Sequence, residues 1–159
     1  MKWLKNIINE IMRYIILFLT YGLIYFIIEC VFKRHLSDYR MALLGGFLGV
    51  CIGIINNAFS FETDLILQGI IGVISVTLAE AIFGYQWNIV QGLHIWDYSS
   101  LRFNGVGGQV CLEFSLFAWF PLSIFCIILD DLINYYWFKL QPCPYYKIGG
   151  KVVFRFKEK

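Results

Sequence analysis

Several polar side chains that could bind a solute or an ion lie close together between residues 96 and 114, in the stretch WDYSSLRFNGVGGQVCLEF. Its charged and amide residues are Asp97, Arg102, Asn104, Gln109 and Glu113. Two more glutamates, Glu29 and Glu80, lie inside strongly apolar runs. Carboxylates in such runs are costly, so they usually face protein or water and mark a substrate, ion or proton site. These residue types therefore favour binding of a polar solute or a cation.

The composition indicates what kind of scaffold must position these groups. Of the 159 residues, 59% are hydrophobic and only 15% are charged, and the mean hydropathy is +0.67. A soluble domain of this length has too little interior to hide that much apolar surface. Apolar runs of about twenty residues instead match the hydrocarbon core of a bilayer. We therefore predict an all-α integral membrane protein.

Four apolar runs are long enough to cross a bilayer. They cover residues 14–32, 41–59, 65–83 and 106–129. Each should be helical, because lipid offers no partner to an unpaired backbone amide or carbonyl. The predicted fold is a four-transmembrane-helix bundle that forms one membrane domain, residues 1–139, followed by a short basic tail, residues 140–159. A structured outer loop is expected before the fourth helix.

The two ends of the chain carry patterns of their own. One helical face of residues 1–13 carries the apolar side chains Trp3, Ile7, Ile8, Ile11 and Met12. This pattern predicts an N-terminal amphipathic helix that lies in the membrane interface before the chain turns inward. A docking helix for a cytoplasmic partner is the alternative. In the tail, Gly149 and Gly150 separate two short stretches, a pattern typical of a β-hairpin.

Basic residues near the ends of the runs predict the orientation. One side carries nine of them, namely Lys2, Lys5, Arg13, Lys139, Lys147, Lys151, Arg155, Lys157 and Lys159. The other side carries four, namely Lys33, Arg34, Arg40 and Arg102. Both termini are therefore expected in the cytoplasm. The formal charge of +2 fits a basic fringe facing anionic lipid and gives no support to nucleic-acid binding.

This topology brings three glutamates to one level. Glu29, Glu80 and Glu113 all fall in the outer leaflet, next to the loop, and we predict that they line one outward-facing site. The remaining predicted site residues belong to the loop: Trp96, Asp97, Tyr98, Arg102, Asn104 and Gln109, with Arg102 and Gln109 at the rim. Carboxylates this close should not all ionise, so the site should hold a proton or share a cation. The alternative is that each glutamate reaches the interface and pairs with a local cation such as Lys33.

Small residues recur at helical spacing in the second run. Gly45, Gly49 and Gly53 lie four residues apart, which makes a smooth stripe that a neighbouring helix can approach closely. We predict that this stripe is a helix-packing device. The sequence leaves open whether the neighbour belongs to the same chain, to a second copy or to another membrane subunit.

The loop also resembles a known family. The stretch WDYSSLRFN followed by GQVCLEFS is similar to the signature of the ABC-transporter type IV membrane proteins, the CmpB-like family of bacterial permeases. The matching positions are Trp96, Asp97, Tyr98, Ser99, Phe103, Asn104, Gly108, Gln109, Cys111 and Leu112. Upstream, TLAEA resembles the family's Thr-x-x-Glu helix at Thr77 and Glu80, and Glu29 resembles its first-helix glutamate. Arg102 stands where the family usually has proline. The resemblance is specific over residues 77–119 and implies a location in the bacterial inner membrane.

Several kinds of chemistry have no motif in this sequence. It contains no phosphate-binding P-loop, so the chain cannot supply ATP energy itself, and a separate ATPase subunit is the partner that a transporter of this kind would need. We predict no catalytic residue, no cofactor and no metal site. The five cysteines show no paired spacing, and a Cys30–Cys111 disulfide stays open.

These observations favour one function and leave two alternatives. We predict a permease-like or substrate- or ion-binding membrane subunit of a transporter, embedded in the lipid bilayer. The first alternative is a small accessory membrane protein that acts by helix–helix interaction, as a homo-oligomer or with another membrane subunit. The second is an intramembrane enzyme that uses Glu113 and Asp97 as acid and base.

Overall fold

Four long apolar helices dominate the structure, a computed structural model that describes residues 2–158 apart from the side chains of residues 2, 5 and 6. Within this part of the chain, four helical segments are long and apolar enough to cross a membrane: Ile7–Lys33, Tyr39–Ala58, Leu65–Val90 and Leu112–Phe138. The first two are helices α1 (Lys2–Lys33) and α2 (Tyr39–Ala58). The predicted set of four membrane-spanning helices is therefore confirmed.

The third and fourth spans are assembled from several helical pieces. The third joins α3 (Leu65–Gly84) to the π-helical segment η1 (Tyr85–Val90). The fourth consists of α4 (Leu112–Phe114), η2 (Ser115–Trp119), α5 (Phe120–Leu132) and η3 (Ile133–Phe138), in which η2 and η3 are also π-helical. Single π-helical turns inside α-helices are rare and are frequent at functional sites. Each of these three segments contains buried polar side chains.

The fourth span does not have the predicted bounds. It begins at Leu112 rather than at residue 106, and it continues to Phe138 rather than ending at residue 129. The late start follows from the backbone of residues 106–108, where φ is 51° at Val106, 64° at Gly107 and 81° at Gly108. These left-handed conformations cannot continue a right-handed helix. The chain forms a small hairpin there instead, with β1 (Asn104–Gly105) antiparallel to β2 (Val110–Cys111).

The turn expected after Arg13 does not occur. Residues 2–33 form one continuous helix, so the amphipathic segment predicted to lie in the interface is the first part of α1. The physical reason is that Arg13, which we expected at the membrane surface, is only 2% exposed and has partners inside the bundle. Its guanidinium holds α1 against the end of the fourth span, in contact with Asn134.

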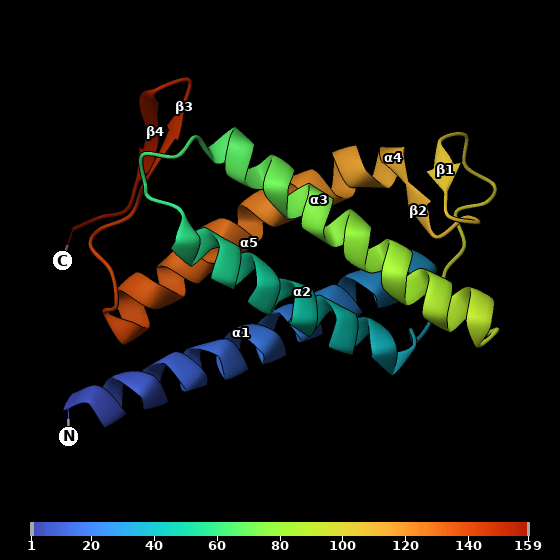
Figure 1. The fold of residues 1–159 in the computed structure, drawn as a ribbon, viewed down its shortest axis with the longest axis horizontal. Coiled ribbons are helices and arrows are strands. Elements are labelled where there is room, and N and C mark those ends of the chain that lie inside the picture. Colours follow the sequence, from blue (N-terminus) through green and yellow to red (C-terminus); the bar gives the residue numbers. More distant parts are fainter. Residues whose placement is uncertain (1, 159) are drawn as a thin grey trace.

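The four spans run in alternating directions, as Figure 1 shows. Both chain ends, the α2–α3 link and the C-terminal hairpin lie at one end of the bundle, which we call the tail end. The α1–α2 link and residues 91–111 lie at the opposite end, which we call the loop end. The core between the ends is apolar and includes the buried side chains of Leu17, Leu48, Val76 and Ile127.

The glycine stripe of α2 packs against α1 of the same chain. A Cβ atom added to Gly45 would collide with Tyr25, one added to Gly49 would collide with Tyr21, and one added to Gly53 would lie 3.0 Å from Leu17. Glycine is therefore required at these positions by close approach of a neighbouring helix. In this structure the helix that faces the stripe is α1.

The tail forms the predicted hairpin. Strands β3 (Tyr145–Ile148) and β4 (Lys151–Arg155) pair antiparallel, and both turn glycines have positive φ, 57° at Gly149 and 77° at Gly150. Such a turn matches the twist of the flanking strands. A lone two-stranded hairpin is marginal in water, so its contacts with the α2–α3 link matter. Lys147 and Tyr145 donate hydrogen bonds to Glu62, and the Gly149 amide donates to Asp64 at 2.6 Å.

Filling the glycine stripe should separate α1 from α2. Gly49→Leu places a branched side chain where the Tyr21 ring lies, and overpacking of this kind costs about 1–3 kcal/mol. The free energy of unfolding, measured in mixed detergent micelles, should fall by that amount. Ala58→Leu is the matched control, because Ala58 is exposed on the same helix and the added side chain has room. Equal losses in the two variants would contradict close packing at Gly49.

Docking of the hairpin should depend on pH through Glu62. Hydrogen bonds from Lys147 and then Tyr145 lower the pKa of Glu62. Because the folded pKa is lowered, Glu62 stabilises docking above its ordinary pKa of roughly 4.3, and this contribution is lost as pH falls through the folded value. Hydrogen–deuterium exchange of the β3–β4 amides should show protection at pH 7 that disappears in acid.

The control for this experiment lies in the same tail. In Glu62→Gln, the amides should be poorly protected already at pH 7, because the neutral amide cannot replace the carboxylate opposite Lys147. Glu158→Gln removes an exposed carboxylate that contacts Arg155 and should leave the pH profile unchanged. A profile in Glu62→Gln that matches the unaltered protein would contradict this role of Glu62.

Candidate functional site

The centre of the candidate site is the carboxylate of Glu80. It lies on α3, is only 1% exposed, and faces the interior of the bundle. Trp119 of η2 donates its indole N–H to Oε2 at 2.8 Å, and Tyr98 of the loop donates its hydroxyl to Oε1 at 3.2 Å. Glu80 is therefore held by two neutral donors that come from two other parts of the chain.

Aromatic rings enclose this carboxylate. Tyr98 stacks on Phe114 with ring centroids 4.8 Å apart, and Tyr25 of α1 lies 5.7 Å from Trp119. Burial raises the pKa of the Tyr98 hydroxyl far above its ordinary value, and the charges of Glu80 and Glu29 raise it further. Tyr98 therefore keeps its proton and acts as a hydrogen-bond donor to Glu80.

Glu29 is the second acidic residue of the site. It interacts electrostatically with Glu80, and it forms an ion pair with Lys33 at 2.7 Å. The Lys33 ammonium also donates to Ser37 at 3.2 Å and to the backbone carbonyl of Ile95 at 3.1 Å. Lys33 therefore links α1 to the loop above the glutamates, and the local pairing considered as an alternative does occur for Glu29.

Glu113 does not join the other two glutamates. Its carboxylate accepts a hydrogen bond from the Cys111 thiol at 2.8 Å, and no contact of Glu113 with Glu29 or Glu80 is recorded among the described residues. The physical reason is helical phase. Glu113 precedes the inward-facing Ser115 by two residues, which is roughly 200° around a helix. Glu113 therefore lies apart from the contacts that involve Glu29 and Glu80. Cys30 and Cys111 are both free thiols.

Two predicted loop residues form a buried scaffold. Gln109 is 3% exposed rather than lying at the rim, and the Trp96 indole donates to its carbonyl at 3.0 Å. Asn88 of η1 donates to the Gln109 side chain at 2.6 Å and to the Trp96 carbonyl at 2.9 Å. Sequence reasoning missed Asn88, although it lies eight residues after Glu80 on the same helical face. These three residues hold the loop against α3.

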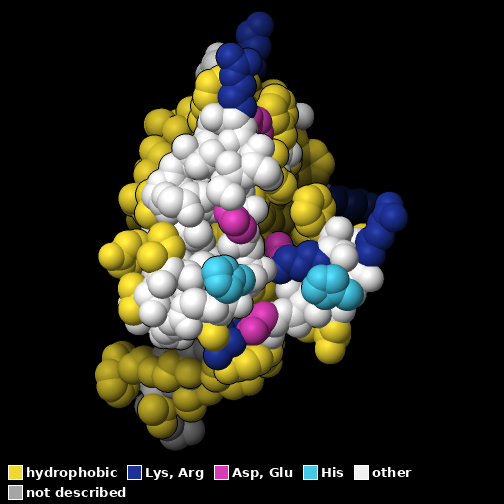
Figure 2. Space-filling view, turned by 90° about the vertical axis from the view of Figure 1, so that its right-hand side faces the viewer, with side chains coloured by type: hydrophobic (Ala, Val, Ile, Leu, Met, Phe, Trp, Pro, Cys, Tyr) yellow, Lys and Arg dark blue, Asp and Glu magenta, His cyan; other side chains and the backbone are white. Residues whose placement is uncertain are grey.

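The other predicted loop residues are exposed at the loop end. Asp97 accepts a hydrogen bond from the Ser99 amide at 2.8 Å, which lowers its pKa, and Asn104 donates to the Leu101 carbonyl at 2.6 Å. Arg102 lies over the ring of Phe103. Figure 2 looks onto this end and shows charged and histidine side chains gathered on a polar face, with hydrophobic side chains around it. The exposed residues stabilise turns above the buried carboxylates.

A second buried polar cluster lies at the tail end, and sequence reasoning missed it. Its members come from α1, α2, α5, η3 and the tail: Arg13, Asn56, Asp130, Asp131, Asn134 and Tyr146. Asn56 donates to Asp130 at 3.0 Å and to Asp131 at 2.9 Å. The signal was available, because two adjacent aspartates at the end of an apolar run are costly unless they find partners. The predicted fourth helix stops at residue 129, just before these two aspartates.

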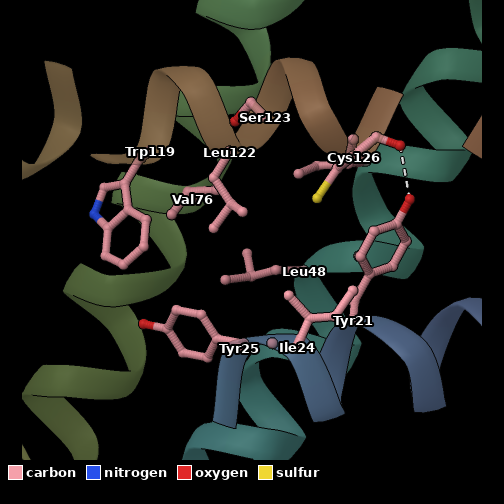
Figure 3. Close-up of a pocket in the computed structure, with 12 residues that line it drawn as sticks. Tyr21, Ile24, Tyr25, Leu48, Val76, Trp119, Leu122, Ser123 and Cys126 are labelled. Atoms are coloured by element: carbon pink, nitrogen blue, oxygen red, sulfur yellow. Dashed lines mark hydrogen bonds between the residues drawn. The ribbon is translucent and has the colours of Figure 1, made fainter. Parts of the chain in front are cut away.

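An apolar centre separates the two polar regions. Figure 3 shows Leu48, Val76 and Leu122 between the Tyr25–Trp119 pair and the hydrogen bond from Tyr21 to the Cys126 carbonyl. The cavity there has a volume of about 30 Å³, which is room for a water molecule or two. Within the described residues, no group of three or more histidine, cysteine or acidic side chains could hold a metal ion.

Removing a donor to Glu80 should destabilise the bundle. Trp119→Phe leaves a buried carboxylate oxygen without its hydrogen bond, which costs about 1–3 kcal/mol. Tyr98→Phe should cost less, because its hydrogen bond is longer. The measurement is the free energy of unfolding in detergent, with Trp137→Phe as the control because Trp137 is 65% exposed. A loss in the control as large as that in Trp119→Phe would contradict the role of this hydrogen bond.

Comparison with known proteins gives one match. The model of a family described as "Putative ABC-transporter type IV" matches residues 16–154, which is most of the chain and includes the loop-end residues and all of the tail-end cluster except Arg13. Searches among curated proteins and among solved structures found no match. The family match extends well beyond the loop signature at residues 96–112. With four apolar spans and a match of this length, the chain belongs to the ABC-transporter type IV family of membrane proteins.

Proposed function

We propose that the protein is a permease-like membrane subunit of a transporter that binds a cation or a proton, or a solute carrying one, at Glu80. The site comprises the Glu80 carboxylate, its donors Tyr98 and Trp119, and the neighbouring pair of Glu29 and Lys33. The proposal places the loop end on the outer side of a bacterial inner membrane and both termini in the cytoplasm. The count of basic residues supports that orientation.

One observation carries this proposal. Glu80 is buried inside the bundle, yet both hydrogen bonds that it accepts come from neutral groups. A buried carboxylate needs a counter-charge or a proton, because its desolvation is not repaid by neutral donors alone. Glu29 carries the same sign of charge and is paired with Lys33. A bound cation or proton would supply the positive charge that the described side chains around Glu80 do not provide.

The apolar centre fits a transport role. A solute that enters at the loop end meets the rings around Glu80 and then the narrow region formed by Leu48, Val76 and Leu122. A permease must block free passage between its two ends, and a packed apolar centre does so. Because the sequence has no P-loop, a separate ATPase subunit would supply the energy.

The two alternatives have less support. The glycine stripe, which motivated the accessory protein, is filled by α1 of the same chain. The enzyme would need Asp97 and Glu113 to act together, but Asp97 caps a turn and Glu113 accepts from Cys111. Neither arrangement gives a paired acid and base.

Glu80→Gln should abolish cation or proton binding at the loop end. The indole of Trp119 contacts the carboxylate, so its fluorescence should change when Na⁺, K⁺ or protons are titrated into the purified protein in nanodiscs. The contribution of Trp119 is isolated by subtracting the signal of Trp119→Phe. In Glu80→Gln this contribution should be lost, because the neutral amide needs no counter-charge.

Glu113→Gln is the matched control. It removes a glutamate from the same end of the bundle that lies away from Trp119, so the titration should remain that of the unaltered protein. If Glu80→Gln titrates like the unaltered protein, or if Glu113→Gln loses the response, binding at Glu80 is refuted.

A further inference from the structure

A polar pocket opens beside the buried cluster at the tail end. Its volume is about 350 Å³, which is enough for a small organic solute. All four spans and the tail contribute to its wall. The polar side chains that line it are Glu10, Arg13, Asn56, Asn57, Ser60, Gln68, Asp131, Gln141 and Tyr146. This pocket is separate from Glu80, which lies on the far side of the apolar centre.

The charge of the wall is negative. Among the described side chains, Arg13 is the one cation that lines the pocket, and it is paired with Glu10 at 3.1 Å and approaches Asp130 at 3.8 Å. Asp131 is 2% exposed and has only neutral donors: Asn56 at 2.9 Å, Gln141 at 3.0 Å and the Tyr146 hydroxyl at 2.7 Å. Over the described residues, the pocket wall and the adjoining cluster therefore contain one positive group, Arg13, and three negative groups, Glu10, Asp130 and Asp131. The carboxylate that lines the cavity without a positive partner is that of Asp131.

The side-chain amides of the wall have their oxygens, and not their nitrogens, available to a ligand. Carboxylates and carbonyls only accept, so the atom of Asn56 that faces two aspartates must be its NH₂ group. The same reasoning fixes Gln141, whose NH₂ donates to Asp131, and Gln68, whose NH₂ donates to the Thr63 carbonyl at 3.0 Å. Among the described residues, the side-chain oxygens of these three amides have no recorded hydrogen bond.

Two of the three residues that carry these oxygens line the pocket and are more than nine-tenths buried as whole residues. Asn56 is 8% exposed and Gln68 is 5% exposed. Their amide oxygens are accessible rather than sealed off, and no described side chain donates a hydrogen bond to them. The pocket is therefore complementary to a ligand that brings N–H groups. In the described part of the wall, Arg13 Nε is the one buried donor with no partner, and it would donate to an oxygen on the same ligand.

We propose that this tail-end pocket binds a small solute with a protonated primary amine, with Asp131 as its counter-charge. The ammonium group offers three N–H donors to a wall whose open positions are carboxylate and amide oxygens. A bare inorganic ion would leave most of a 350 Å³ cavity unfilled. The inference does not depend on the proposed role of Glu80, and it gives the membrane domain a second binding site at the opposite end.

The test compares ethanolamine with tetramethylammonium, which has the positive charge but no N–H group, and with ethylene glycol, which has neither. Calorimetry is performed on the full chain in phosphatidylcholine nanodiscs, because the headgroup of this lipid has no N–H. Ethanolamine should bind, tetramethylammonium should bind about tenfold more weakly because it cannot donate hydrogen bonds, and neutral ethylene glycol should not bind. Failure of ethanolamine to bind, or equal binding of tetramethylammonium, would overturn the proposal.

Substitutions locate the binding. Asp131→Asn keeps the size of the side chain and removes its charge, so ethanolamine affinity should fall about tenfold or more. The exposed Glu158→Gln should leave it unchanged. Ethanolamine binding that persists in Glu80→Gln separates this site from the one at the loop end. Loss of binding in Glu80→Gln with retention in Asp131→Asn would refute the assignment.

A second variant covers the case in which Asp131→Asn fails to fold. Gln68→Met replaces the carboxamide with a thioether, so the wall loses the amide oxygen and Thr63 loses the hydrogen bond from the NH₂ group. Ethanolamine binding should weaken several-fold, whereas unaltered affinity would count against the acceptor-rich wall. A final arm identifies the source of the amine. If phosphatidylethanolamine in the nanodisc competes with ethanolamine, the ligand is a lipid headgroup, and if it does not, the ligand is a free amine.

Discussion

The contact between α1 and α2 is the constraint on which the rest of the structure depends. Residues of α1 at four-residue spacing, Leu17, Tyr21 and Tyr25, lie against the glycines of α2 at the same spacing. Ridges of this kind interlock when both helices present small or well-fitted residues. The same row of α1 continues to Arg13 at the tail end and to Glu29 and Lys33 at the loop end. Close packing in the middle therefore brings the polar residues at both ends into the bundle.

The third span repeats this arrangement. Along α3 and η1, the buried positions Gln68, Gly72, Val76, Glu80, Gly84 and Asn88 follow one another at intervals of four. The polar members lie toward the ends and the apolar or small members between them. Gly72 allows Ser123 to approach, and Gly84 allows Gln109 and Trp96 to approach. A helix of this type packs in lipid through its small residues and satisfies its polar residues through neighbouring helices.

Both polar regions contain a carboxylate that only neutral groups contact by hydrogen bonds. At the loop end this residue is Glu80, with Tyr98 and Trp119, and at the tail end it is Asp131, with Asn56, Gln141 and Tyr146. Neutral donors occupy the hydrogen-bond acceptor positions of a carboxylate without cancelling its charge. Each end is thereby suited to a cationic ligand, while the apolar centre between them keeps the two sites independent.

The sequence by itself determined the membrane class, the four long apolar helices, the helical spacing of the glycines in α2 and the turn of the tail hairpin. These features depend on local composition and spacing, because lipid enforces helical runs and close helix approach demands small residues. Glu80 could be singled out because a carboxylate inside an apolar run is costly wherever the run packs.

Only the tertiary structure decided which polar groups meet. Glu113 faces away because the fourth span begins at Leu112, and that start depends on left-handed backbone at residues 106–108. Arg13 is buried because Asn134 and Asp130, more than a hundred residues away in the chain, lie opposite it. The tail-end pocket needs all four spans and the hairpin together. Spacing within one helix determines which residues share a face. Which helix packs against that face depends on the whole bundle, and no single apolar run encodes it.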